Sequence, residues 1–176
     1  MSEHAGLASF TVRRLVSSDA AAYRDLRLRG LREYPEAFGA AWDEEAARPL
    51  DWFAERLERN VVFGGERAPA AGLGGVVGFR VFTSAKERHK GILWGMFVQR
   101  AARRTGLAPS LVARVLDHAR QTVEEVRLTV VATNASAIRL YEQAGFARYG
   151  LEPRAMKIGD DYHDEVLMAL SLRRAG

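Results

Sequence analysis

Residues 96–111 read Met96-Phe97-Val98-Gln99-Arg100-Ala101-Ala102-Arg103-Arg104-Thr105-Gly106-Leu107-Ala108-Pro109-Ser110-Leu111. The pattern predicts an apolar strand, a basic loop that contains a glycine, and a helix with one apolar stripe. A helix that begins here leaves its first backbone N–H groups unpaired, and its dipole adds about 0.3–1 kcal/mol for an anion. Gly106 lets the backbone approach a ligand because it has no side chain. We therefore expect a phosphate-binding turn, although a plain strand–helix connection gives the same pattern.

The chain on both sides of this segment has the periodicities of a mixed α/β domain. Strands are expected over 10–16, 61–65, 74–82, 92–98, 126–131, 147–151 and 166–170. Helices are expected over 19–32, 49–58, 106–120 and 134–144, with a loop or broken helix over 33–47 and a loop over 154–163. No repeat or linker divides the sequence, so we expect a single domain over residues 1–176.

Composition excludes several classes of protein. The chain has 26 basic and 22 acidic residues intermixed, so we expect no nucleic-acid binding, and the local excess at Arg100, Arg103 and Arg104 suits a small polyanion better. Zero cysteines exclude disulfides and thiolate chemistry, and the four histidines lack ligand spacing, so no metal is expected. No apolar run reaches the roughly 18–20 residues of a membrane span, and no signal peptide is recognisable. A cytoplasmic protein without membrane contact is the expectation.

The segment 103–108 resembles the pyrophosphate loop of the GNAT acetyltransferases, whose pattern is [Q/R]-x-x-G-x-[G/A]. Arg103-Arg104-Thr105-Gly106-Leu107-Ala108 satisfies that pattern in full. Two positions depart from the family's habit. Arg104 stands where glycine is frequent, and Pro109 removes one backbone donor just beyond the loop.

A second block strengthens the resemblance. Residues 128–146 look like the family signature V-x-x-x-N-x-x-A-x-x-L-Y-x-x-x-G-F, with Asn134 as a helix N-cap and Tyr141 two turns later on what we expect to be the same face. By periodicity alone, Tyr141 would be a half-buried core aromatic. With the closing Asp164–Leu170 segment, the resemblance covers roughly residues 75–172.

The resemblance implies a mixed, mostly antiparallel central sheet, splayed into a V and flanked by about four helices. Acetyl-CoA would enter the V as co-substrate. The residues implied to hold it are Met96, Phe97, Val98, Arg103, Arg104, Thr105, Gly106, Leu107, Ala108, Asn134 and Ser136. Tyr141 would be the general acid for the leaving thiolate. A homodimer is expected by analogy.

The acceptor is expected to be a primary amine of a small molecule or a peptide. The strand 92–98 contains no acidic residue or histidine to serve as base, so the candidates are Glu33, Glu44, Glu45 and His89, with Glu44 first. Residues expected to line the acceptor pocket are Phe38, Glu44 and Trp94, together with Trp42 and the loop 154–163, although such aromatics are also typical of a core. A CoA-binding sensor module without catalysis is the alternative.

Overall fold

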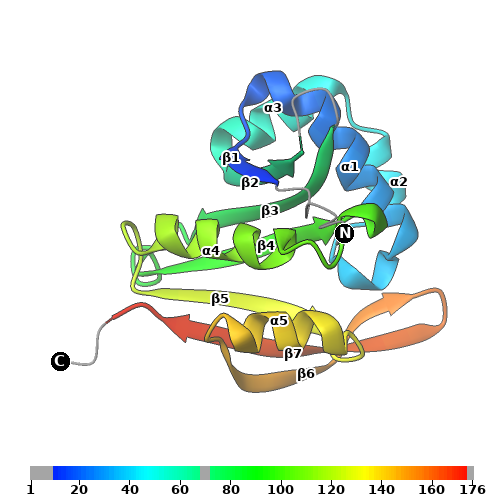
Figure 1. Cartoon of the computed structure of the whole chain (residues 1–176). Helices are drawn as coiled ribbons and strands as arrows, with labels where there is room; N and C mark the ends of the chain where they lie inside the picture. Colours follow the sequence, from blue (N-terminus) through cyan, green and yellow to red (C-terminus); the bar gives the residue numbers. More distant parts are fainter. Residues whose placement is uncertain (1–9, 68–71, 174–176) are drawn as a thin grey trace, which may run out of the picture.

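A seven-stranded sheet organises the computed structural model, which describes residues 10–67 and 72–173 (Figure 1). The strands are β1 (Thr11–Arg14), β2 (Val61–Glu66), β3 (Leu73–Val81), β4 (Lys90–Val98), β5 (Glu125–Val131), β6 (Ala147–Ile158) and β7 (Asp161–Ser171). The helices are α1 (Ala20–Glu33), α2 (Trp42–Ala46), α3 (Leu50–Arg59), α4 (Leu107–Ala119) and α5 (Ala135–Gln143). Three short 3-10 turns complete the list: η1 (Ser17–Asp19), η2 (Pro35–Ala37) and η3 (Arg100–Ala102).

The sheet divides between β4 and β5 into the V that the family resemblance implied. Its strand order is β1-β2-β3-β4-β5-β7-β6, and all neighbours are antiparallel except β4 and β5. These two parallel strands pair only at Lys90↔Glu125, Gly91↔Val126 and Ile92↔Arg127. Beyond Ile92 they separate, so the sheet is a V that opens toward the carboxyl ends of both strands.

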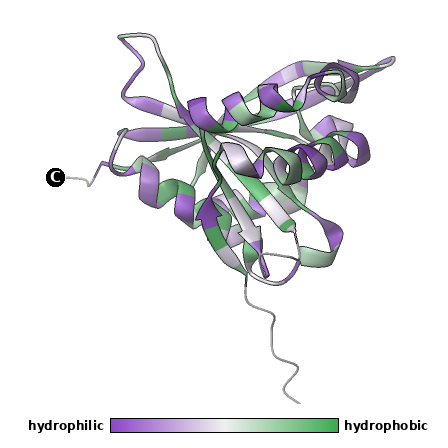
Figure 2. Ribbon diagram, turned by 90° about the horizontal axis from the view of Figure 1, so that it is seen from above, coloured by the Kyte–Doolittle hydropathy of each residue, from purple (hydrophilic) through white to green (hydrophobic). Residues whose placement is uncertain are grey.

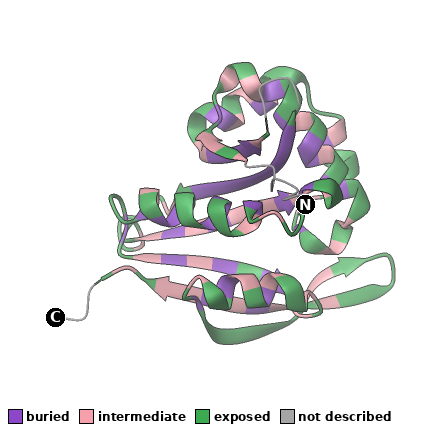
Figure 3. Cartoon of the chain, in the orientation of Figure 1, coloured by how far each residue is buried: buried purple, intermediate pink, exposed green. Residues whose placement is uncertain are grey.

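Helices cover the two faces of the sheet over separate hydrophobic clusters. One cluster joins α4 and α5 to the sheet, and the other joins α1 and α3 to it. Strand β3 serves both faces, because Val77 lies in the first cluster and Val76 in the second. Figure 2 shows hydrophilic and hydrophobic positions alternating around the helices, and Figure 3 shows their buried sides turned toward the sheet. No helix in the described part of the chain is long and apolar enough to cross a membrane.

Helix α4 shows how the apolar stripe fixes the position of the loop before it. Leu107, Leu111 and Val115 recur every four residues and are fully buried. Burying each such side chain contributes about 1.5–3 kcal/mol relative to exposure. The stripe therefore holds the N-terminus of α4 at the open end of the V.

Every expected strand and helix is present, and three details differ. The helix expected from residue 19 begins one residue later, at Ala20, and Ser17–Asp19 form η1. The interval 33–47 is a broken helix, one of the two forms expected, and its α2 brings the α-helices of the described residues to five rather than about four. The interval 154–163 was wrongly expected to be a loop, because β6 and β7 continue through it and turn at Gly159. A bulge between Glu152 and Met156 interrupts the alternation there, so the sequence pattern ended too early.

Candidate active site

A groove of about 950 Å³ opens where β4 and β5 separate, a size typical of ligand sites. Its lining comes from both faces of the sheet. The α4 and α5 side contributes Ala102, Arg103, Arg104, Gly106, Ala108, Pro109, Thr133, Asn134, Ser136, Ala137, Arg139, Leu140 and Gln143. The sheet contributes Met96, Phe97, Val98 and Val131, and the side of α1 contributes Tyr34, Glu36, Ala37 and Phe38. The groove thus passes through the V from one face to the other.

The turn before α4 has the conformation that an anion site requires. Gly106 is the N-cap of α4 and has φ 85°, in the left-handed region. A Cβ placed on it would meet no atom within 4 Å, so this backbone lies open to the groove. Arg104 also has a positive φ, 60°, which explains why glycine is frequent at this position in the family that the loop resembles. The Thr105 hydroxyl donates a hydrogen bond to the Ala102 carbonyl at 2.6 Å and closes the loop.

Arg103 connects this loop to the opposite face of the sheet. Its Nε donates to the Val98 carbonyl at 3.1 Å, and its guanidinium lies 4.9 Å from the centre of the Tyr34 ring. Arg104 and Arg139 line the groove as well. Three guanidiniums beside an open helix N-terminus match a polyphosphate in charge and in hydrogen-bonding capacity.

Strand β4 forms the floor of the groove and carries a bulge. Gly78 pairs with Trp94 and Val76 pairs with Phe97, so the strand accommodates one additional residue near Gly95, whose φ is 61°. Along the edge that separates from β5, the backbone groups of β4 have no strand partner beyond Ile92. An extended ligand can pair with such an edge in the manner of an added strand.

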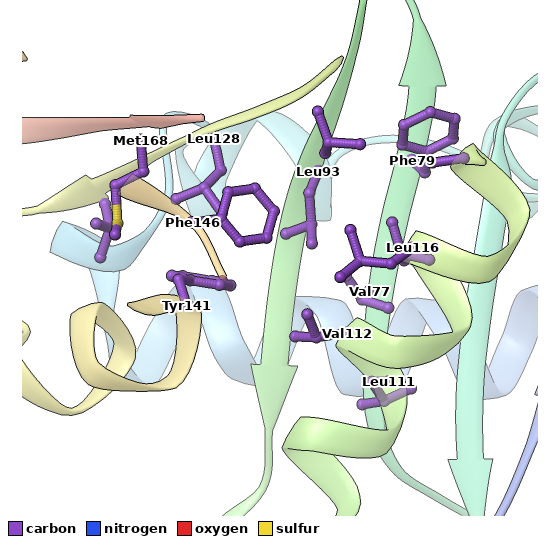
Figure 4. Close-up of a cluster of buried hydrophobic side chains, with 14 of the residues drawn as sticks. Val77, Phe79, Leu93, Leu111, Val112, Leu116, Leu128, Tyr141, Phe146 and Met168 are labelled. Atoms are coloured by element: carbon purple, nitrogen blue, oxygen red, sulfur yellow. The ribbon is translucent and has the colours of Figure 1, made fainter. Parts of the chain in front are cut away.

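Helix α5 borders the groove through its first turn and one face. The Oδ1 of Asn134 accepts a hydrogen bond from the Ala137 amide at 3.0 Å, which confirms Asn134 as N-cap. Tyr141 is buried in the core instead, with its ring 5.9 Å from that of Phe146 (Figure 4). Tyr141 does not line the groove, although only seven residues, about two helical turns, separate it from Asn134. Burial raises the pKa of the Tyr141 phenol well above its ordinary value.

Most of the other predicted cofactor residues line the groove, and two do not. Met96, Phe97, Val98, Arg103, Arg104, Gly106, Ala108 and Ser136 line the groove with Asn134. Thr105 and Leu107 do not line it. The Leu107 side chain is buried beneath α4, which leaves its backbone amide as the group near the turn.

The residues predicted for the acceptor side are only partly brought together. Phe38 lines the groove, and its ring lies 6.3 Å from that of Phe97. Glu44 and Trp42 are exposed on α2, away from the lining. Trp94 is half-buried and stacks with the Arg56 guanidinium at 4.7 Å, also outside the lining.

None of the four base candidates lines the groove within the described residues. Glu33 and Glu44 are exposed, Glu45 is buried in an ion pair, and His89 precedes β4 at the closed end of the V. The carboxylate that does line the groove is Glu36, in η2, which the sequence patterns missed. Within residues 10–67 and 72–173, no three histidine, aspartate or glutamate side chains are arranged to hold a metal ion.

Comparison with known proteins agrees with this geometry. The sequence profile described as the acetyltransferase (GNAT) family matches residues 28–146. A GNAT-family acetyltransferase from Streptococcus pneumoniae superposes with a TM-score of 0.80 at 19% identity, over 93% of this chain and 99% of that one. A putative acetyltransferase from Salmonella typhimurium, solved with its cofactor acetyl-CoA, gives 0.77 at 21% identity over 96% of each chain. The ribosomal-protein-S18-alanine N-acetyltransferase of Escherichia coli gives 0.71 at 23% identity, over 96% and 97%. No curated protein sequence matched.

Proposed function

The chain belongs to the acetyltransferase (GNAT) family, and on this premise we propose that it transfers the acetyl group of acetyl-CoA to a primary amine. The observation that carries the proposal is the groove itself. It combines an unpaired length of β4 with an open, arginine-rich helix N-terminus at the same end of the V. A small molecule and a peptide are both acceptors that such an open groove admits.

The described residues fit acetyl-CoA along its length. We assign the pyrophosphate to the backbone amides of 104–108 and to the guanidinium of Arg103, because these groups surround the open backbone at Gly106. The pantetheine arm would pair with the backbone of Met96–Val98, and the Asn134 amide would add a hydrogen bond. Ser136, one residue into α5, lines the same wall.

Acetyl-CoA supplies an activated acyl group as a thioester, and the protein must orient it and manage protons. A backbone N–H of β4 near the Gly95 bulge would stabilise the charge that develops on the carbonyl oxygen. Tyr141 is proposed to return a proton to the leaving sulfur, a role typically worth about 10²–10⁴ in rate. A phenol with its ordinary pKa of 10.0 is already protonated at neutral pH, as a general acid requires, and burial raises the pKa of Tyr141 further, which makes it a weaker proton donor.

A second candidate is a module that binds acetyl-CoA without catalysis. The placement of Tyr141 in the core, outside the groove lining, favours this alternative. The two functions share the cofactor site and differ only in turnover.

Calorimetric titration with acetyl-CoA tests the cofactor site, with Gly106→Glu as the comparison. We expect saturable binding by the wild-type protein and loss of binding in the variant, because the added carboxylate would occupy the phosphate position. Release of free thiol in the presence of a polyamine, lysine, an aminoglycoside and a peptide with a free amino terminus then tests transfer. Absence of wild-type binding at millimolar acetyl-CoA would refute the assignment, and binding without turnover would select the sensor.

A further inference from the structure

We propose that Glu36 binds the acceptor's ammonium group and accepts its proton before the amine attacks the thioester. This inference rests on the proposed transferase function and assigns the base that β4 lacks. It also sets the substrate class, because the acceptor must present a cationic primary amine to a carboxylate.

Glu36 lies on the side of the groove opposite to the phosphate turn. It belongs to η2, which follows α1 and contacts both β5 and β6 across the V. The phosphate turn precedes α4, on the other face of the sheet. Glu36 lines the same groove, and its neighbours Tyr34 and Phe38 pack against Phe97 of β4, so a cofactor that extends from Gly106 along β4 would pass beside it.

The backbone on both sides of Glu36 is anchored, so its position is well defined. The Tyr34 amide donates to the Gly30 carbonyl at 2.9 Å, and the Ala37 amide donates to the Tyr34 carbonyl at 3.0 Å. The Tyr34 ring lies 6.1 Å from that of Phe97, and Phe38 is buried against the same ring. The anchored backbone fixes where the Glu36 side chain begins, which limits the conformational entropy lost when its carboxylate binds a ligand.

The charges in the groove point to an ammonium ligand at this end. Glu36 is the single carboxylate among the described lining residues, against the guanidiniums of Arg103, Arg104 and Arg139. It is half-buried, and no side chain within residues 10–67 and 72–173 forms a hydrogen bond or ion pair with it. Glu45, in contrast, is neutralised by two arginines. A cationic amine is the partner that offsets a partly desolvated carboxylate.

The proton balance requires such a group. An alkyl ammonium must lose one proton to expose its lone pair, and at neutral pH nearly all of it is protonated. Glu36 takes that proton, the amine nitrogen bonds to the carbonyl carbon, and the carbon–sulfur bond breaks. Tyr141 gives its proton to the departing thiolate, which leaves as the free thiol, and the Tyr141 oxygen recovers the second proton of the nitrogen. Glu36 then releases its proton to water, so the products are an amide, a thiol and one proton.

The test compares Glu36→Gln with Glu33→Gln, a matched change at an exposed glutamate at the end of α1 that lies outside the groove. We expect Glu36→Gln to lower kcat/KM for the amine by about 10²-fold at pH 7, with acetyl-CoA affinity within about twofold of wild type. We expect that deficit to shrink toward pH 9.5, where more of the amine is already neutral. Glu33→Gln should have the kcat/KM of wild type at both pH values and the same affinity for acetyl-CoA.

Three outcomes would overturn the role. Glu36→Gln with the kcat/KM of Glu33→Gln would show that the carboxylate is not used. A deficit of the same size at pH 7 and pH 9.5 would assign Glu36 to packing rather than to proton transfer. Wild-type protein that binds acetyl-CoA but acetylates none of the four amine classes would overturn the transferase function itself, and the role of Glu36 with it.

Discussion

Arg27 of α1 and Glu45 of α2 form a buried bidentate ion pair, with guanidinium Nε and Nη2 at 2.9 and 2.8 Å from the two carboxylate oxygens. Arg56 of α3 donates a third hydrogen bond to Glu45 at 2.9 Å. The pair also lies against β4, because a Cβ built on Gly95 would be 3.2 Å from Nη1 of Arg27. Three helices are therefore tied together beside the bulge in β4.

Replacing Glu45 should be among the most destabilising single changes in this protein. Glu45→Ala leaves Arg27 buried without a counter-charge, so we expect a loss of about 3–5 kcal/mol in the free energy of unfolding. Urea denaturation measures the change. Glu44→Ala is the control, because Glu44 is exposed on the same helix and should change stability by less than about 0.5 kcal/mol. Equal values for the two variants would contradict a structural role of the ion pair.

The carboxylate of Glu45 should make the free energy of unfolding depend on pH in the acid range. Burial alone would raise the pKa of Glu45, but the hydrogen bonds and charges of Arg27 and Arg56 outweigh it and lower that pKa below its ordinary value of 4.5. A lowered folded-state pKa means that this stabilisation is complete above about pH 4.5 and is lost as pH falls through the folded-state pKa. The gap in unfolding free energy between wild type and Glu45→Ala should therefore narrow below pH 4.5. A gap that is constant from pH 7 to pH 3 would refute this.

The phosphate turn can be tested with two glycines of similar conformation. Gly106 and Gly159 have φ of 85° and 60°, and a Cβ at either would meet no atom within 4 Å. Alanine at either site should cost roughly 1–2 kcal/mol of stability through the left-handed backbone. Only Gly106→Ala should weaken acetyl-CoA binding, by about tenfold, because Gly159 lies in the distant β6–β7 turn. Calorimetry on both variants separates the effects, and equal affinities would place the pyrophosphate elsewhere.

Asn134 combines a structural role with a proposed ligand role, and two substitutions separate them. Asn134→Ala removes the cap on α5 and should lower stability by about 0.5–2 kcal/mol. Asn134→Ser keeps a capping oxygen, so thermal unfolding should return close to wild type. Both variants lose the side-chain amide and should bind acetyl-CoA about 3–10-fold more weakly. Wild-type affinity in Asn134→Ser would limit Asn134 to capping.

Sequence patterns predicted the elements whose periodicity is uninterrupted, including the stripe of α4 and the Asn134 cap. They failed for the second half of β6, because a left-handed Arg154, with φ of 55°, and a bulge break the alternation there. Sequence patterns also failed to predict the surroundings of two carboxylates, Glu45 and Glu36. The partners of Glu45 lie 18 and 11 residues away on other helices, and a glutamate on a short helix normally faces solvent. Glu36 joins the groove only because η2 crosses the V, which no local pattern encodes.

A role for Tyr141 in core packing and a role in catalysis predict different turnover for the Tyr141→Phe variant. Tyr141→Phe keeps the buried ring and its contact with Phe146, so the fold and the cofactor groove should be preserved. If the hydroxyl donates the proton to the leaving thiolate, turnover should fall by about 10²-fold with acetyl-CoA affinity unchanged. Tyr149→Phe, at an exposed tyrosine of β6, is the control and should leave both quantities at wild-type values. The rate of thiol release measures turnover in the two variants, and calorimetry measures their affinity for acetyl-CoA. Full turnover in Tyr141→Phe would make Tyr141 a core residue alone, and the leaving thiolate would then take its proton from water.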